Sequence, residues 1–231
     1  MIHILYRHTS NVSGFGKNRP HWFSYENSLN NILTSINGDP NTTFHLLYDG
    51  KCSIEDSRID NIISFDGGSD WNSYLFAWNY AKQLNIEDND IIYIAENDYA
   101  FVPGWSYKLQ ELFDVFDELD YVTLYDHNDK YNPNVYPNLS TYLFVTKNHH
   151  WRTVPNTTGS IIFTKRILDE DFDIHTSNPS DFRRFEFLRN NRQRNILSPV
   201  PSLATHCEIE YLAPVVNWEL IIKEQNNDRT I

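Results

Sequence analysis

The sequence has few cysteines, no long apolar run and no leader-like N-terminus. Cys52 and Cys207 are its only cysteines, too few for a disulfide framework and without the spacing of a metal site. No stretch approaches the roughly 20 consecutive apolar residues of a membrane span. The opening MIHILYRHTS lacks a basic segment followed by a long apolar core, so we expect no signal peptide. These absences predict a cytoplasmic protein with reduced thiols and no integral membrane segment.

Several common motifs are also missing. The sequence has no Walker pattern, no G-x-G-x-x-G and no G-x-S-x-G, which removes the usual kinase, dehydrogenase and esterase interpretations. Its nine histidines include no His-x-x-x-His pair, so zinc hydrolase motifs are absent too. The net charge of −12 argues against nucleic acid or an anionic membrane as the main partner. An acidic protein can still bind phosphates where a metal supplies the positive charge.

What is present indicates one globular domain spanning residues 1–231. Hydrophobic residues make up 40% of the chain and charged residues 22%, which suits a sizeable core. We find no internal repeat and no low-complexity linker that would divide it. Strands and helices alternate from residue 2 to residue 95, which predicts an α/β fold with a mostly parallel sheet and covering helices. The expected strands are Ile2–Tyr6, Phe44–Tyr48, Ile62–Phe65 and Ile91–Ala95, and the expected helices are Tyr25–Ile36 and about 15 residues capped by Ser69 or Asp70.

The second half of the chain has a more mixed pattern. An amphipathic helix is expected from Trp105 to Leu119, and residues 141–146 and 151–154 predict a hairpin that forms a small antiparallel extension. Asn178-Pro179 divides a helical region between residues 165 and 194. Ser180 is expected to cap the second helix, whose buried stripe would be Phe182, Phe185 and Leu188. The residues after Glu210 have the pattern of a C-terminal tail.

Polar side chains follow each of the N-terminal strands. Glu96 and Asp98 flank Asn97 at the end of the fourth strand, and two carboxylates separated by one residue can both face one hard cation. The alternative is an acidic turn after a strand. The other strand ends carry Arg7 and His8, Asp49, and Asp66 before two glycines. Because ligands of open α/β sheets bind outside the carboxyl ends of the strands, we expect these groups to lie together along the carboxyl-end edge of the sheet, called the rim below.

Four further side chains are candidates for the same site. The imidazole of His206 could complete a metal shell begun by Asp98, although an ordinary structural histidine is the alternative. Asp181 opens a helix and is a candidate general base, but helix N-termini favour an aspartate for electrostatic reasons alone. Arg152 and Lys130 could offset the charge of a diphosphate, unless they are surface cations.

The strand order, the Glu96-Asn97-Asp98 turn, Pro103-Gly104 and the late His206 together resemble the GT-A fold of nucleotide-sugar glycosyltransferases. Within that superfamily the chain is most similar to small family-2-like proteins with an E-D-D-Y motif, which here reads Glu96-Asn97-Asp98-Tyr99. The resemblance covers about residues 2 to 219. It implies a GT-A-like, Rossmann-related fold in which the turn after the fourth strand acts as a D-x-D motif.

The resemblance also implies roles for individual residues. The first strand end and Asp49 would hold the nucleotide. Asp98 and His206 would bind Mn²⁺ or Mg²⁺ beside Glu96. Asp181 would be the catalytic base. The first strand end here comprises Tyr6, Arg7 and His8. Asn97 stands where the family has an acidic residue, which removes one charge at the metal.

We therefore expect a metal-dependent, inverting glycosyltransferase. It would move a sugar from a nucleotide-diphosphate donor, with UDP as the expected nucleotide, to a hydroxyl group of a glycan or other acceptor. One alternative is a nucleotidyltransferase acting on a sugar phosphate. Such enzymes usually have a Gly-rich basic loop after the first strand, which Gly14, Gly16, Lys17 and Arg19 imitate only loosely. The other is a non-catalytic carbohydrate- or nucleotide-binding protein of the same fold.

Overall fold

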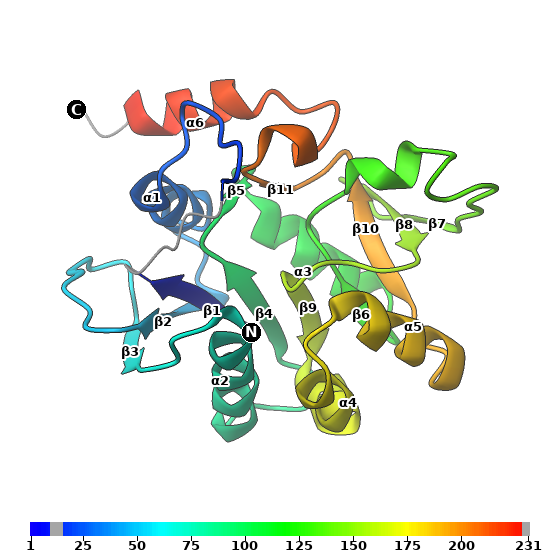
Figure 1. Cartoon of the computed structure of the whole chain (residues 1–231), viewed down its shortest axis with the longest axis horizontal. Helices are drawn as coiled ribbons and strands as arrows, with labels where there is room; N and C mark the ends of the chain where they lie inside the picture. The colour runs from blue at the N-terminus through cyan, green and yellow to red at the C-terminus, as the bar shows by residue number, and fades with distance from the viewer. Residues whose placement is uncertain (10–15, 228–231) are drawn as a thin grey trace.

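The computed structural model describes residues 1–9 and 16–227, and a nine-stranded sheet forms its centre (Figure 1). The strand order is β3 (Asn61–Phe65), β2 (Thr42–Asp49), β1 (Ile2–Thr9), β4 (Ile91–Glu96), β9 (Ile161–Thr164), β6 (Tyr121–Val122), β10 (Ile196–Val200), β8 (His150–Val154) and β7 (Leu143–Val145). β1 pairs in parallel with β2 and β4, and β2 pairs in parallel with β3. The α/β, Rossmann-like architecture predicted from the sequence is confirmed.

The second half of the sheet contains the antiparallel pairings. β9 runs antiparallel to both β4 and β6, and the predicted hairpin is present as β7 and β8. β8 pairs antiparallel with β10, so the hairpin extends the main sheet. β10 was not expected from the sequence, because Ser198 and Pro199 interrupt its apolar run and proline is rare inside strands.

Side chains of the central strands alternate between two apolar layers. On β1, Ile4 and Tyr6 face one layer and Leu5 faces the other. On β4, Tyr93 and Ile94 divide between the same two layers. This is the period of two expected of a strand whose faces are both covered. The apolar runs in the sequence follow from that double burial.

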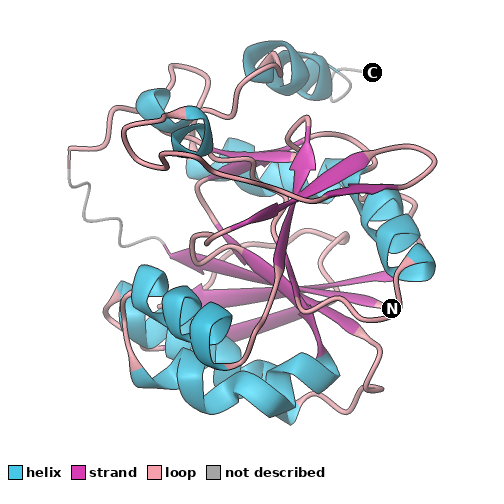
Figure 2. Ribbon diagram, turned by 90° about the vertical axis from the view of Figure 1, so that its right-hand side faces the viewer, coloured by secondary structure: helices cyan, strands magenta, loops and turns pink. Residues whose placement is uncertain are grey.

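Helices cover both faces of the sheet (Figure 2). One layer packs against α1 (Tyr25–Ser35), α3 (Trp105–Val115) and α6 (Trp218–Asn227), and the other against α2 (Asp70–Gln83), α4 (Lys165–Ser177) and α5 (Asp181–Asn191). Hydroxyl side chains cap four of these helices by accepting a hydrogen bond from a first-turn backbone N–H. The capping residues are Ser24, Ser69, Thr164 and Ser180. No helix of the described chain has the length and hydropathy needed to cross a membrane.

A second, two-stranded sheet lies beyond the end of β4. β5 (Tyr99–Phe101) and β11 (Ala204–His206) pair antiparallel, with Tyr99 opposite His206. The backbone N–H of Cys207 also donates to the carbonyl oxygen of Asp98 at 2.8 Å. This pairing joins the turn after the fourth strand to a segment from the end of the chain.

Two expectations for the C-terminal half were wrong. The segment predicted as a tail contains α6, where the exposed fractions of Trp218 and Ile222 are only 3% each. Gln225 of this helix lies within hydrogen-bond distance of Asn31 on α1. Phe182, predicted in the buried stripe of α5, is 57% exposed, because Arg184, Phe185 and Leu188 form the buried face of this helix. Phe185 and Leu188 are buried as expected.

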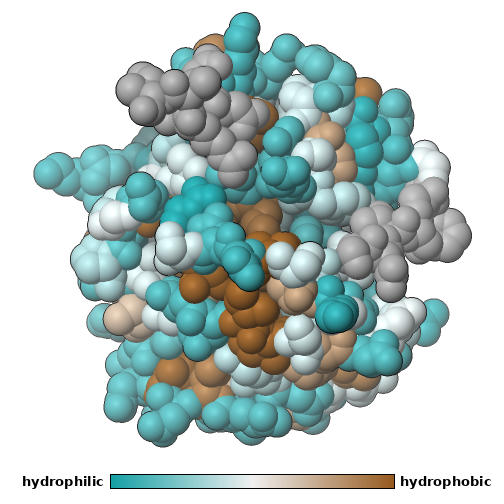
Figure 3. Space-filling view, turned by 90° about the vertical axis from the view of Figure 1, so that its left-hand side faces the viewer, coloured by the Kyte–Doolittle hydropathy of each residue, from teal (hydrophilic) through white to brown (hydrophobic). Residues whose placement is uncertain are grey.

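The first and last strands of the sheet leave apolar side chains at the surface. Figure 3 shows apolar residues gathered in the middle of the face that lies on the left in Figure 1, where β3 forms the edge. Ile62 of β3 is 45% exposed, and Leu143 of β7 at the opposite edge is 63% exposed. Short edge strands such as β7 limit pairing with other chains, because they offer few backbone groups.

A buried polar network ties α2 and α4 to the sheet. The ring of His175 lies 3.0 Å from the hydroxyls of both Tyr74 and Tyr121, and it stacks on Trp78 at 4.0 Å. The Tyr121 hydroxyl donates to the fully buried carboxylate of Asp171 at 2.7 Å. Burial lowers the pKa of His175 well below 6.5, so this imidazole is neutral in the folded protein.

This network predicts a measurable loss of stability in mild acid. The unfolded chain takes up a proton at His175 below about pH 6.5 and the folded chain does not, so stability falls as the pH is lowered past that value. We expect His175→Gln to reduce the slope of unfolding free energy against pH by up to about 1.4 kcal/mol per unit between pH 6 and 5. Urea unfolding at several pH values measures it. The exposed His21→Gln is the control, and equal slopes for both variants would contradict the assignment.

Candidate functional site

Arg7 braces the carboxyl ends of β1 and β4. The parallel register sets Arg7 beside Glu96, and their side chains meet at 3.0 Å. Arg7 also donates to the side chain of Asp70, at the start of α2, at 2.5 Å. Burial, opposed by the charge of Arg7, raises the pKa of Glu96 to about 7. The guanidinium of Arg7 is therefore occupied by the carboxylates of Glu96 and Asp70, and only 6% of the Arg7 side chain is exposed.

Asp98 is the centre of a cluster of basic groups. Its Oδ2 lies 3.0 Å from Nε2 of His206, and it accepts hydrogen bonds from Arg19 at 2.8 Å and Lys17 at 3.0 Å. Arg19 donates in addition to the carbonyl oxygen of Cys207 at 2.7 Å. The structure thus brings together Asp98 and His206, the residues predicted to share a metal, and adds two cations that were not assigned to that role.

The electrostatics of this cluster favour the ionised carboxylate. Burial alone would raise the pKa of Asp98, but the hydrogen bond and charge of His206, with Lys17 and Arg19, hold it well below its usual range. The side chain of Asp98 is 11% exposed, whereas that of Lys17 is 45% exposed. The cluster therefore presents positive charge to solvent and keeps its negative charge beneath.

The contacts of Asp98 do not fit a divalent cation. Among the described residues, no group of three or more His, Cys, Asp or Glu side chains could hold a metal ion. Glu208 approaches His206 at 3.8 Å, but at Nδ1, the ring nitrogen that faces away from Asp98. A dication at Asp98 would also meet the positive charges of Lys17 and Arg19. Metal binding by Asp98 and His206 stays a prediction from the sequence.

Aromatic rings surround the end of β1. His8 packs against Tyr6, Tyr25 and Tyr48 with ring centroids 5.4–6.5 Å apart. Burial lowers the pKa of His8 to about 4, so its ring is neutral near pH 7. Within the described chain, Nδ1 of His8 and the hydroxyl of Tyr6 are buried without a hydrogen-bond partner. Tyr6 is fully buried, so its side chain supports the rim from below.

Asp49 holds the loop after β3. Its carboxylate accepts hydrogen bonds from the backbone N–H groups of Gly67 at 2.8 Å and Gly68 at 3.1 Å. A Cβ on Gly67 would lie 2.9 Å from Asp49 Oδ2, so this close approach requires glycine. Asp66, just before this loop, is exposed. The predicted convergence of β2 and β3 ends is thus present, although Asp49 is engaged by the loop.

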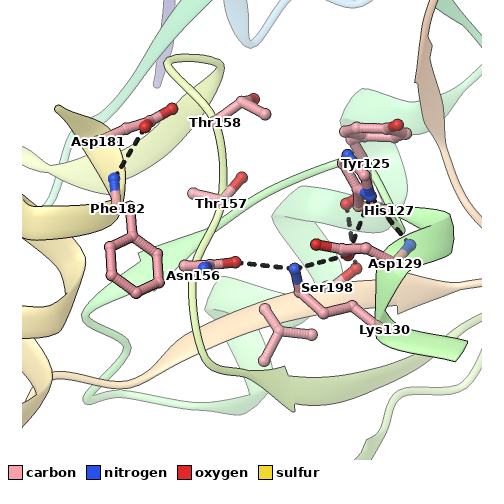
Figure 4. Close-up of a pocket in the computed structure, with 11 residues that line it drawn as sticks. Tyr125, His127, Asp129, Lys130, Asn156, Thr157, Thr158, Asp181, Phe182 and Ser198 are labelled. Atoms are coloured by element: carbon pink, nitrogen blue, oxygen red, sulfur yellow. Dashed lines mark hydrogen bonds and ion pairs between the residues drawn. The ribbon is translucent and has the colours of Figure 1, made fainter. Parts of the chain in front are cut away.

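A pocket of about 150 Å³ lies beside this rim (Figure 4). Asp181 and Phe182 of α5 form one wall, and the opposite wall comes from the segment around the 3₁₀ helix η1 (Asn128–Tyr131). The residues lining the pocket are Tyr125, His127, Asp129, Lys130, Val154, Asn156, Thr157, Thr158, Asp181, Phe182 and Ser198. Asp181, predicted as a catalytic base, therefore lines a cavity.

The wall opposite Asp181 is a fixed polar network. Nζ of Lys130 contacts Asp129 at 2.8 Å and the side-chain oxygen of Asn156 at 2.7 Å. Nδ1 of His127 lies 2.9 Å from the carboxylate of Asp129. Only 3% of the Lys130 side chain is exposed, so Asp129 and Asn156 fix its ammonium group at the pocket. Of the two cations predicted to offset a diphosphate, Lys130 is thus the one that lines a cavity.

The loop between β8 and β9 joins this pocket to the strand ends. Thr158 lines the pocket and its hydroxyl lies 2.8 Å from that of Tyr99. The ring of Tyr99 lies 5.3 Å from that of His206. A Cβ on Gly159 would meet Oε1 of Glu96 at 2.9 Å. Tyr99 thus lies between the pocket and the Asp98 cluster, in contact with Thr158 of the pocket and with His206 of the cluster.

Arg152 occupies a structural position. It donates to Asp126 at 2.7 Å, and its guanidinium lies 4.5 Å from the ring of Tyr131, whose hydroxyl also donates to Asp126. Asp126 is 2% exposed. The prediction that Arg152 contacts a nucleotide gains no support from these contacts.

Sequence reasoning missed several residues of this region. Asn97 was already named in the sequence motif, and it is half-buried in the turn between Glu96 and Asp98. Lys17 and Arg19 were noted only as a loose likeness to a basic loop, and Gly14 of that likeness lies outside the described residues. The sequence signal for a basic cluster at this end of the sheet was the presence of two basic residues, Lys17 and Arg19, soon after the first strand. The sequence assigned no role to His127, because its contacts with Asp129 depend on the fold of η1.

Comparisons with known proteins give the fold little further support. A scan against protein-family models and a search of curated proteins find no match for this chain. Among solved structures, the chain is similar to 2-C-methyl-D-erythritol 4-phosphate cytidylyltransferase (IspD) of Francisella tularensis, with 12% identity, a TM-score of 0.47, and coverage of 97% of this chain and 98% of that chain.

Two further solved structures show a likeness of the same degree. The CMP:2-keto-3-deoxy-manno-octonic acid synthetase complexed with CTP has 13% identity and a TM-score of 0.45, over 98% of both chains. S. aureus TarS has 11% identity and a TM-score of 0.48, over 85% of this chain and 34% of that chain. The chain thus spans about a third of TarS. Since these TM-scores lie below 0.5, the fold assignment depends on the strand order and pairing described above.

The position of Arg152 leads to a stability prediction. We expect Arg152→Met to destabilise the protein by about 3–5 kcal/mol, because it leaves the buried carboxylate of Asp126 without its cation. Adding Asp126→Asn should recover most of the loss. Urea unfolding of both variants, with the exposed Arg189→Met as control, measures this. A single variant as stable as the parent would show that Arg152 is free to serve a ligand.

Proposed function

We propose that this protein transfers a sugar from a nucleotide-diphosphate donor, with UDP as the first candidate, to a hydroxyl acceptor. The observation that carries the proposal is the adjacency of the Asp98 cluster and the pocket lined by Asp181. Phosphate groups need cations and hydrogen-bond donors, and a hydroxyl acceptor needs a base within reach. The Asp98 cluster offers the cations and hydrogen-bond donors, and the pocket offers the carboxylate of Asp181 as the base.

The donor half is supported by the ends of β1 and β4. Lys17 and Arg19 supply positive charge at Asp98. Next to Arg19, the partly exposed ring of Tyr25 packs against the largely buried, neutral ring of His8. A nucleoside diphosphate has matching parts, with a base that stacks on rings and a doubly charged pyrophosphate group. Nδ1 of His8, buried without a described partner, is a group that a base could satisfy.

The acceptor half is supported by the pocket. Asp181 lies at its wall beside the exposed ring of Phe182, and aromatic rings stack on the apolar faces of sugars. In an inverting transfer, the Asp181 carboxylate takes the acceptor hydroxyl proton as its oxygen bonds to the sugar C1. The bond from C1 to the diphosphate breaks, and the diphosphate leaves with the electron pair.

One observation favours a second candidate, nucleotidyl transfer to a sugar phosphate. Lys17 and Arg19 follow the first strand and reach the strand ends, as the basic loop of such an enzyme would. The reaction would consume a nucleoside triphosphate and release pyrophosphate. It differs from sugar transfer in its products, which makes the two candidates separable.

A donor-hydrolysis assay tests the proposal. Each member of a panel of UDP-, GDP-, ADP- and CMP-sugars is incubated with the protein, and the release of free nucleotide is followed. We expect slow release from at least one nucleotide-diphosphate sugar. Pyrophosphate release from a nucleoside triphosphate and a sugar phosphate, without donor hydrolysis, would support the second candidate. Nucleotide binding without turnover on either panel would indicate a non-catalytic binding protein.

The proposed base leads to a separate prediction. Asp181→Asn should lower the rate of donor hydrolysis by about 10²–10⁴-fold, because water also needs a base, and should leave the dissociation constant for UDP unchanged. Glu186→Gln, an exposed carboxylate on the same helix, is the control. Hydrolysis by Asp181→Asn at the parent rate would exclude Asp181 from the reaction, or would indicate a transfer that retains configuration.

A further inference from the structure

We propose that Lys17 and Arg19 neutralise the diphosphate in place of a divalent cation, and that Asp98 serves to hold these two side chains in position. This inference rests on the proposed function and concerns its donor half. It departs from the sequence expectation, in which Asp98 binds a metal and the metal binds the phosphates. The difference comes from the contacts that the Asp98 carboxylate makes.

The first support is the occupation of the carboxylate. Its Oδ2 alone has Arg19 at 2.8 Å, Lys17 at 3.0 Å and His206 at 3.0 Å. With one negative charge facing two permanent positive charges, the cluster has no electrostatic need for a further cation. A dication at Oδ2 would have to displace both side chains, and a dication at either oxygen would lie close to their positive charges. The arrangement therefore selects an anion as the next group to bind.

The second support is the number of hydrogen-bond donors that remain. A lysine ammonium has three N–H donors and an arginine guanidinium has five. Lys17 uses one for Asp98. Arg19 uses donors for Asp98 and for the carbonyl oxygen of Cys207, and it also has a side-chain hydrogen bond with Tyr25. The Lys17 side chain is 45% exposed, so its remaining donors can reach a ligand from solvent. A diphosphate has several oxygens and can contact both side chains at once.

The third support is the way Arg19 is held. Its guanidinium lies 4.6 Å from the ring of Phe23, and its side chain is 18% exposed. Phe23 precedes α1, while Cys207 and His206 come from the end of the chain. Arg19 is thus fixed from two sides and has little conformational freedom to lose when a ligand binds, which lowers the cost of binding.

Titration calorimetry with UDP separates the two roles of Asp98. If Lys17 and Arg19 bind the diphosphate, UDP should bind equally well in EDTA and in Mn²⁺, and more weakly as NaCl is raised. Lys17→Met and Arg19→Met should each weaken UDP binding by about tenfold or more, because each removes charge-assisted hydrogen bonds. Lys147→Met, which removes an exposed lysine in the β7–β8 turn, should leave it unchanged.

Asp98→Asn gives the sharpest result, because the two interpretations predict different outcomes. Under our proposal UDP binding in EDTA should persist, because the substitution removes the charge that repels the diphosphate but leaves a side-chain oxygen that can still accept hydrogen bonds from Lys17 and Arg19. Under the metal interpretation the substitution should abolish Mn²⁺-dependent binding. UDP binding that needs Mn²⁺, is lost in Asp98→Asn and is unchanged in Lys17→Met would overturn the inference and leave the transferase proposal standing.

Two controls keep the outcome clear. Thermal unfolding of every variant reports whether it is folded. If Arg19→Met is not folded, Lys17→Met alone decides the test, because the exposed Lys17 side chain adds little to the core. The parent protein is also titrated with CDP, GDP and ADP. Failure of all four nucleoside diphosphates to bind, with and without Mn²⁺, would overturn the proposed function itself and the inference with it.

Discussion

The antiparallel pairing of β5 with β11 is the constraint on which the site depends. It sets Tyr99 opposite His206, and the next step along the chain joins the backbone of Cys207 to that of Asp98. Asp98 and His206 are 108 positions apart in sequence, and the main-chain hydrogen bonds of this pairing place their backbones side by side. Because side chains alternate along a strand, a slip of one residue would turn His206 to the other face. The register of this short sheet therefore decides which groups meet at the rim.

Around this pairing, the rim is organised by ion pairs in which carboxylates position cations. Glu96 and Asp70 hold Arg7, Asp98 holds Lys17 and Arg19, and Asp129 holds Lys130. The chain as a whole carries a net charge of −12, yet charges separated by more than about 8 Å are screened at physiological ionic strength. The local arrangement of donors, more than the total charge, therefore decides whether an anion binds there.

Most of the fold could be predicted because local patterns and tertiary packing agree in it. The apolar run before Glu96 reads as a buried strand, and Ser69 and Ser180 start helices where their hydroxyls accept backbone hydrogen bonds. α6 was missed because its apolar residues all lie in its first half and are followed by the polar segment KEQNN, so they show no helical period along its whole length. β10 was missed because Pro199 looks like a strand breaker and is tolerated here in a mixed sheet.

The site was predictable only in part, for a different reason. Strand ends of a parallel sheet converge by topology, so Arg7 and Glu96 could be placed together from the sequence. The partners of Asp98 come from a loop and from a strand that is distant in sequence. A D-x-D-like turn has the same sequence whether its carboxylates face a metal or a lysine. Lys17 and Arg19 could be seen in the sequence, but their direction could not. Residue type limits the chemistry of a site, whereas the neighbours that tertiary contacts supply decide which chemistry is used.

If the Asp98 cluster binds a diphosphate, as we propose, the presence of a carboxylate there needs a physical reason, since its charge repels the ligand. Without Asp98, the ammonium of Lys17 and the guanidinium of Arg19 would repel each other and the lysine would sample many rotamers. A single carboxylate oxygen holds both and so lowers the entropy that a ligand must overcome. A diphosphate carries more charge and more oxygens than that one carboxylate, so it can engage both cations while Asp98 stays beneath them. On this argument Asp98 organises the donors of the site, and its acidity serves the protein's own cations.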